Sequence, residues 1–162
     1  MKIGFFDIET TGFNPEKDKV LVVCIANSSN SRIRVIKSDK NEEEEVITNA
    51  LAALSVYGSL VSWNGASFDV PFLAKRANRY GLKFAPTNHI DLKQKSAKFF
   101  PKIEKTLDSM ALTFLIDKEK SPYDASIWKL AKTGDRKSVE YIVEHCSTDV
   151  ELLKRLWKAI ME

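Results

Sequence analysis

The opening segment, KIGFFDIE at positions 2–9, constrains the fold more than any other part of the chain. Its aromatic and β-branched residues predict a β-strand, in which side chains alternate between two faces, so Asp7 and Glu9 point the same way. Apolar residues precede them on both faces, which indicates a central strand covered on both sides. Two carboxylates at its end would repel each other and lose hydration unless a cation lay between them. The pair therefore indicates either a divalent metal site or a solvated strand end.

The rest of the chain alternates strands and helices, which predicts an α/β domain. The first three strands are expected to form a meander, and two more strands follow between helices. The expected strands are 2–9, 20–26, 32–37, 59–64 and 89–92. The expected helices are 41–58, 70–80, 106–114, 123–131 and 138–160. In the first helix, Asn41 is the expected N-cap, and the acids at 42–45 suit the positive end of the helix dipole.

The length of 162 residues suits a single domain that spans residues 1–162. No apolar run is long enough to cross a bilayer and no signal peptide is evident, so we expect a cytoplasmic protein without a membrane role. Cys24 and Cys146 are too few for a disulfide framework and are expected to be small buried residues. The net charge of +3 permits a polyanionic partner without requiring one.

The final predicted helix contains an acidic residue on its apolar stripe. The stripe consists of Ile142, Cys146, Asp149, Leu153, Leu156 and Ile160. An ionised Asp149 on a buried helix face is costly unless it is paired or bound to a metal ion. His145 lies one helical turn before it. Asp149 is therefore either satisfied by an arginine or by backbone amides, or it belongs to a site.

A third polar segment, Asn64 to Asp69, lies where a predicted strand meets a helix, a common place for ligand sites in α/β sheets. Asp69 is also the expected N-cap of that helix, whose first turn contains Pro71. Basic residues form two groups, which are expected to be solvated faces unless they follow a phosphate backbone. The groups are Lys93, Lys95, Lys98, Lys102 and Lys105, and Lys75, Arg76 and Arg79.

Taken together, these segments resemble the motifs of the DEDD, or DnaQ-like, 3′–5′ exonuclease superfamily, which has a ribonuclease H-like fold. The D-x-E-T motif matches the segment from Asp7 to Thr10, N-x3-F-D matches Asn64 to Asp69, and the third motif resembles the segment around Asp149. The pattern is most similar to YprB-type ribonuclease H-like proteins and to family B polymerase proofreading domains. The resemblance implies a mixed sheet, antiparallel in its first three strands and parallel afterwards, flanked by helices.

The third motif departs from the family pattern. One subfamily has Tyr four residues before the last aspartate and another has His five residues before it, whereas this chain has His145 four residues before Asp149. The resemblance implies that two Mg²⁺ or Mn²⁺ ions are held by Asp7, Glu9, Asp69 and Asp149. His145 would then orient or deprotonate the attacking water.

The resemblance also implies a substrate and a polarity of attack. The terminal nucleotide would lie against Thr10, Thr11 and Gly12, and Asn64 and Phe68 would contact its sugar or base. Phe68 and Trp63 are alternatively core residues. The expected reaction removes nucleoside 5′-monophosphates from a free 3′ end of single-stranded nucleic acid, with DNA favoured over RNA. Two alternatives stay open: an internal or structure-specific nuclease of the same fold, and a catalytically inactive nucleic-acid-binding module. The motifs do not indicate an oligomeric state.

Overall fold

The computed structural model describes residues 2–30, 32–101, 106–116 and 121–161. Five strands form one sheet in the order β3-β2-β1-β4-β5. Their bounds are β1 Ile3–Thr10, β2 Val20–Asn27, β3 Ile33–Lys37, β4 Ser59–Ser62 and β5 His89–Asp91. Strand β2 is antiparallel to both β1 and β3, whereas β4 is parallel to both β1 and β5. The predicted mixed sheet, antiparallel first and parallel afterwards, is confirmed.

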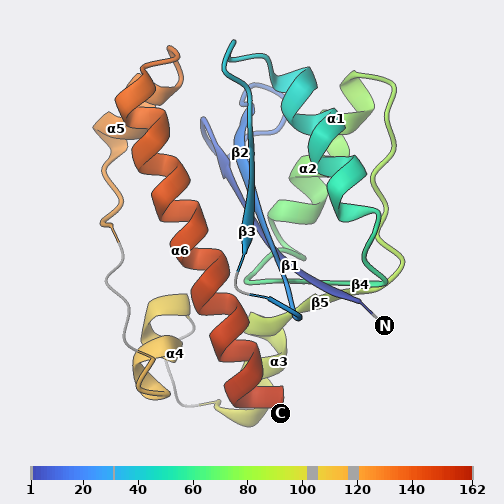
Figure 1. Cartoon of the computed structure of the whole chain (residues 1–162), viewed down its shortest axis with the longest axis vertical. Coiled ribbons are helices and arrows are strands. Elements are labelled where there is room, and N and C mark those ends of the chain that lie inside the picture. The colour runs from blue at the N-terminus through green and yellow to red at the C-terminus, as the bar shows by residue number, and fades with distance from the viewer. Residues whose placement is uncertain (1, 31, 102–105, 117–120, 162) are drawn as a thin grey trace.

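Six helices within the described residues surround this sheet (Figure 1). Their bounds are α1 Glu43–Leu54, α2 Asp69–Arg79, α3 Leu92–Phe99, α4 Leu107–Thr113, α5 Ala125–Ala131 and α6 Arg136–Met161. Helices α1 and α2 lie on one face, and the long α6 crosses the other face with α5 packed beside it. Because β1 is central, Phe5 enters the core under α6 while Phe6 enters the core under α1 and α2.

The side chains of β1 alternate between the two faces of the sheet, as predicted from the sequence, and each face is covered by helices. Ile3 and Phe5 precede Asp7 and Glu9 on the face that α6 covers, as expected. The apolar residues of α6 at positions 142, 146, 153 and 156 are buried, so the predicted stripe does face the sheet. Cys24 and Cys146 are buried free thiols, also as predicted. No helix in the described ranges is both long enough and apolar enough to cross a membrane.

Several helix ends differ from the sequence prediction. Asn41 is not an N-cap: its φ of 57° is left-handed, its amide donates to the carbonyl of Lys132, and α1 begins at Glu43. Helix α3 was not predicted, and it forms because the Asp91 carboxylate caps its first turn by accepting from the Gln94 N–H. Asp124 caps α5 in the same way, which delays the start of that helix to Ala125.

Candidate active site

Asp7 and Glu9 lie at the carboxyl end of β1, under α6. One oxygen of each carboxylate and the Sγ atom of Cys146 lie within 4.8 Å of one another. The pairing of β1 with β2 shifts register between Glu9 and Thr10, so the strand ends in an irregularity directly after the two acids. These features place the two carboxylates predicted from the sequence side by side at the end of a buried central strand.

Asp69 reaches the same strand end from α2. It is the first residue of that helix and not its N-cap, and its Oδ1 accepts a hydrogen bond from the Ile8 N–H at 3.3 Å. The predicted N-cap position is therefore wrong, because Phe68 occupies it and the Asp69 carboxylate reaches across to the backbone of β1. Gly65 makes this close approach possible: a Cβ there would lie 1.9 Å from Ser62 Oγ and 3.2 Å from Asp69 Oδ2.

Asp149 and His145 reach the site from α6. The Nε2 atom of His145 lies 3.9 Å from Asp149 Oδ2. The Nδ1 atom lies 2.8 Å from the carbonyl oxygen of Ser121, to which an Nδ1–H would donate. That tautomer leaves the basic nitrogen on the side that faces Asp149. A histidine four residues before the aspartate thus does lie beside it.

The electrostatics show that these acids face one another. Burial raises the pKa of Asp7 well above its usual value, and the carboxylates of Asp69, Glu9 and Asp149 raise it further. Burial also raises the pKa of Asp69 to about 7, although backbone N–H groups oppose the shift, and the carboxylates of Asp91 and Asp149 add to it. Four acids predicted from distant parts of the sequence thus form one cluster whose mutual repulsion a cation would relieve.

The donor set fits a hard divalent cation. Carboxylate oxygens are the ligands that Mg²⁺ and Mn²⁺ prefer. The nearby thiol does not change this, because burial, the Cys24 thiol and the Asp7 carboxylate raise the pKa of Cys146 well above its usual value and keep it protonated. Cys146 instead donates toward the backbone carbonyl of Asp7 at 3.5 Å. The group at the end of β1 could therefore hold a metal ion through oxygen ligands.

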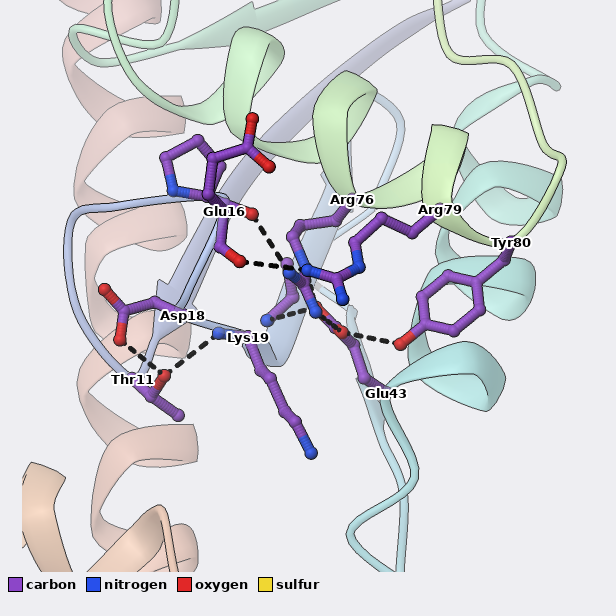
Figure 2. A network of polar contacts seen from close by, with 10 residues as sticks. Thr11, Glu16, Asp18, Lys19, Glu43, Arg76, Arg79 and Tyr80 are labelled. Carbon is purple, nitrogen blue, oxygen red and sulfur yellow. Dashed lines mark hydrogen bonds and ion pairs between the residues drawn. The ribbon is translucent and has the colours of Figure 1, made fainter.

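The three residues expected to contact the substrate end lie at the last position of β1 and in the turn that follows it. The Thr10 hydroxyl donates to the Gly12 carbonyl at 2.6 Å. Figure 2 shows Thr11 Oγ1, which donates to Asp18 Oδ1 at 3.2 Å and accepts from the Lys19 N–H. Both hydroxyls are thus used inside the turn. A Cβ on Gly12 would lie 2.5 Å from Asp18 Oδ2, so the absence of a side chain there lets the Asp18 carboxylate close the turn.

Asn64 and Phe68 flank the site on the β4–α2 loop. Asn64 has a left-handed backbone with φ of 63°, its N–H donates to Asp91 Oδ1 at 3.1 Å, and its side-chain oxygen accepts from Lys93 at 3.2 Å. The ring of Phe68 packs edge to face with Phe13 at 5.9 Å. Phe13 is 83% exposed. Sequence reasoning did not single out this aromatic residue, which lies beside two predicted substrate contacts.

A buried ion pair fastens the turn after β1 to α2, and Figure 2 shows Arg76 and Tyr80 directed at Glu43. The side chains of Arg76 and Glu43 are only 4% and 2% exposed. Glu43 accepts from Arg76 Nε at 2.8 Å, from the Tyr80 hydroxyl at 2.7 Å and from the Val20 N–H at 2.7 Å. Arg76 also donates to the Pro15 carbonyl at 2.9 Å, so the helix that begins at Asp69 holds the turn in place.

The residues of the two basic groups differ in their exposure to solvent. The expectation of a solvated face is wrong for Arg76, which is buried because it lies on the apolar side of α2 beside Phe72, Leu73 and Ala77. Lys95 and Lys98 are exposed on α3, as expected, and Lys93 is half-buried. Lys102 and Lys105, the last members of that group, lie outside the described residues.

Two further residues touch the site without having been predicted. Trp128 of α5 donates its indole N–H to Glu9 Oε2 at 3.1 Å. Asp91 at the end of β5 accepts from the N–H groups of Asn64 and Ala66, both at 3.1 Å, and so holds the loop before Asp69. Trp128 resembles an ordinary core residue, and Asp91 lies in a segment that was predicted only as a short strand.

Comparisons with known proteins agree with this architecture. The family model of the RNase H superfamily matches residues 4–161. A DNA polymerase of Methanocaldococcus jannaschii is 28% identical over 93 residues, which cover 51% of this chain and 6% of the polymerase. The structure of the family B DNA polymerase from Pyrobaculum calidifontis superposes with a TM-score of 0.83 at 20% identity, over 99% of this chain and 24% of the polymerase.

The chain spans only a small part of either polymerase, so these two likenesses concern the fold of one region. The family match, by contrast, covers both ends of the sheet and all four acids of the cluster. A ribonuclease H-like fold, expected from the sequence motifs, is confirmed, and such a fold points to a nuclease. The chain belongs to the RNase H superfamily.

Proposed function

We propose that this chain is a metal-dependent 3′–5′ exonuclease that hydrolyses the phosphodiester bonds of single-stranded nucleic acid, DNA in preference to RNA. The observation that carries the proposal is the convergence of Asp7, Glu9, Asp69 and Asp149 from β1, α2 and α6, with the pKa values of Asp7 and Asp69 raised by burial and by the neighbouring acids. The products would be nucleoside 5′-monophosphates. Membership of a nuclease superfamily supports hydrolysis of a phosphodiester as the reaction class.

The four carboxylates would hold two divalent ions, Mg²⁺ or Mn²⁺. When bound, such ions supply activation of water near neutral pH and stabilisation of charge on the attacking and leaving oxygens. Asp7, Glu9 and Asp149 would hold the first ion, and Asp7 and Asp69 would hold the second. This division follows the family pattern, and the oxygen donor set fits it.

His145 would orient or deprotonate the nucleophilic water. Its Nδ1 lies at the Ser121 carbonyl, which sets the tautomer, and its Nε2 lies on the side of Asp149. An imidazole is the side chain that most often serves as a general base toward a nearby water molecule. The position of the ring beside Asp149 supports this role despite the unusual spacing in the third motif.

The substrate end would lie over the turn after β1. With the hydroxyls of Thr10 and Thr11 engaged inside the turn, the backbone around Gly12 is the surface that a terminal nucleotide would approach. Phe68 and the exposed Phe13 would stack on its base, and Asn64 would contact its sugar. The exposed lysines of α3 would follow the phosphate backbone, which predicts salt-dependent binding.

The test is digestion of single-stranded DNA and RNA, labelled at either end, with Mg²⁺ or Mn²⁺. We expect labelled 5′-monophosphates from the 3′ end, no reaction on a blocked 3′ end, and a loss of at least about 100-fold in the Asp7→Asn variant, because metal ions contribute several kcal/mol and each 1.4 kcal/mol is tenfold. Asp39→Asn is the matched control, since Asp39 is an exposed carboxylate paired with Lys37.

Each alternative gives a different result in this assay. Cleavage that ignores the blocked 3′ end would indicate the internal or structure-specific nuclease. Binding without hydrolysis at any metal concentration would indicate an inactive nucleic-acid-binding module. Hydrolysis that survives Asp7→Asn would show that the acids at the end of β1 are not the catalytic ones.

A further inference from the structure

We propose that Trp128 is a positioning residue of this site, which orients Glu9 through its indole N–H and His145 through its ring. The inference rests on the proposed function, in which Glu9 is a metal ligand and His145 serves the attacking water. Trp128 comes from α5, Glu9 from β1 and His145 from α6, so one side chain contacts two site residues from different elements.

The first contact fixes the carboxylate of Glu9. Trp128 Nε1 lies 3.1 Å from Glu9 Oε2, and the indole is 7% exposed. An indole N–H can only donate, so Glu9 Oε2 is the acceptor in this bond. A bond to one oxygen restricts rotation of the carboxylate and thus limits the directions in which the other oxygen can point. Partners of this kind, one step removed from the metal, orient ligands and strengthen metal binding.

The second contact fixes the ring of His145. The indole and imidazole rings lie edge to face, with centroids 5.2 Å apart and planes at 88°. The indole is itself held by Tyr123, at 4.7 Å between ring centroids, and by Tyr141, at 6.3 Å. Because the ring cannot tilt without disturbing these neighbours, the same packing that places the N–H at Glu9 also limits the orientation of His145.

Packing alone is the competing explanation, since a buried tryptophan commonly finds a hydrogen-bond partner for its N–H. The Trp128→Phe substitution distinguishes packing from positioning, because it keeps an aromatic ring in the core and removes only the N–H donor and part of the ring area. Trp157 provides a matched control. It is 8% exposed, packs edge to face on Phe5 at 6.0 Å, and lies on the same face of the sheet at a groove away from the acids.

The primary experiment measures Mn²⁺ binding to the chain without nucleic acid, by the electron paramagnetic resonance signal of free Mn²⁺. We expect Trp128→Phe to raise the Mn²⁺ dissociation constant about 10-fold, as for other residues that support a metal ligand, and Trp157→Phe to change it less than about twofold. With nucleic acid, Trp128→Phe should lower kcat and leave KM within about twofold, since the residue does not contact the substrate. Equal Mn²⁺ affinities for the two variants would overturn the proposal.

A second measurement needs no variant that could fail to fold. The chain has three tryptophans, so a ¹⁵N–¹H spectrum of the unaltered protein contains three indole N–H signals. We expect Mg²⁺ to shift the signal of Trp128 and to leave that of Trp157 in place. A Trp128 signal that does not move at Mg²⁺ concentrations that saturate the site would overturn the positioning role.

The two proposals fail in distinguishable ways. If Mg²⁺ shifts the Trp128 signal and Mn²⁺ binding depends on Trp128 but no nucleic acid is hydrolysed, the positioning role stands and the proposed activity is wrong. If hydrolysis depends on Asp7 but Mn²⁺ affinity does not depend on Trp128, the activity stands and the positioning role is wrong. A chain that binds no Mn²⁺ would overturn the positioning role together with the metal site.

Discussion

Replacing Asp69 by Asn should stabilise the metal-free protein at pH 8 and have little effect at pH 4. The pKa of this carboxyl is raised to about 7, chiefly by burial, against about 3.9 in an unfolded chain. Between pH 4 and pH 7 the folded state therefore binds more protons than the unfolded state. Under that condition the free energy of unfolding falls as pH rises, and the loss is complete above pH 7.

The size of the effect follows from the pKa difference. A difference of about 3 units corresponds to about 4 kcal/mol, since each unit is worth 1.36 kcal/mol. Asparagine cannot ionise, but it keeps a carbonyl oxygen that can accept the Ile8 N–H that Asp69 accepts at 3.3 Å. We expect the free energy of unfolding of Asp69→Asn to exceed that of the wild type by about 2 to 4 kcal/mol at pH 8 and to lie within about 1 kcal/mol of it at pH 4.

Urea unfolding at pH 4 and pH 8, in EDTA and again in Mg²⁺, measures this directly. Mg²⁺ should restore most of the wild-type stability at pH 8, because a cation removes the repulsion among the acids, and it should do less for Asp69→Asn. Asp39→Asn serves as control: Lys37 lowers the pKa of Asp39, so its removal should not stabilise the protein at pH 8. A variant no more stable than the wild type at pH 8 in EDTA would refute the reasoning.

Three further substitutions test the scaffold and the substrate surface. Arg76→Met should lower the free energy of unfolding by about 3 to 5 kcal/mol, because it leaves the Glu43 carboxylate buried without its cation, and adding Glu43→Gln should recover part of that loss in urea unfolding. Gly65→Ala should cost about 1 to 3 kcal/mol in the same assay, because its Cβ would meet Ser62 Oγ at 1.9 Å. Phe13→Ala should raise KM for a single-stranded oligonucleotide about 5-fold or more, and change stability by less than about 0.5 kcal/mol.

Controls for these variants come from positions without the same surroundings. Gly81 has a left-handed φ of 70° but open space at its Cβ, so Gly81→Ala isolates backbone strain from the steric clash expected at Gly65. Leu115 is as exposed as Phe13 but lies elsewhere on the surface, so Leu115→Ala should leave KM unchanged. Equal losses of unfolding free energy in Gly65→Ala and Gly81→Ala would contradict the steric explanation. Equal KM values for Phe13→Ala and Leu115→Ala would contradict the substrate contact proposed for Phe13.

Periodic features of the fold could be predicted from the sequence. Strand alternation placed Asp7 and Glu9 on one face, and the helical stripe placed Asp149 against the sheet, because both patterns depend only on local geometry. The bond between Trp128 and Glu9 joins residues 119 positions apart, and the local sequence around neither residue predicts it. Helix α3 was missed for a similar reason, since its cap Asp91 serves both α3 and the loop at Asn64.

The argument that identified Asp149 also applies to two charged residues that were not predicted to be buried. Glu43 shares a helical stripe with Val46, Ile47 and Ala50, and Arg76 shares one with Phe72 and Leu73, so the spacing alone predicts both charges to be buried. Neighbouring like charges made the two buried residues difficult to recognise in the sequence. Glu43 is one of four consecutive acids, and Arg76 follows Lys75. The phase of the helix, and not the local charge density, decides which member of such a run enters the core.

Periodicity thus shows that a charge is buried but not what faces it. Glu43 and Arg76 meet each other, so their burial needs nothing further and serves to hold the turn after β1 against α2. Asp149 meets Asp7 and Asp69, so burial there adds repulsion and raises the pKa of both partners. Opposite charges make a structural pair, whereas like charges favour protonation or the binding of a cation from outside the chain. Only the tertiary structure shows the sign of the charge that each buried residue faces. That sign distinguishes the structural ion pair from the candidate active site.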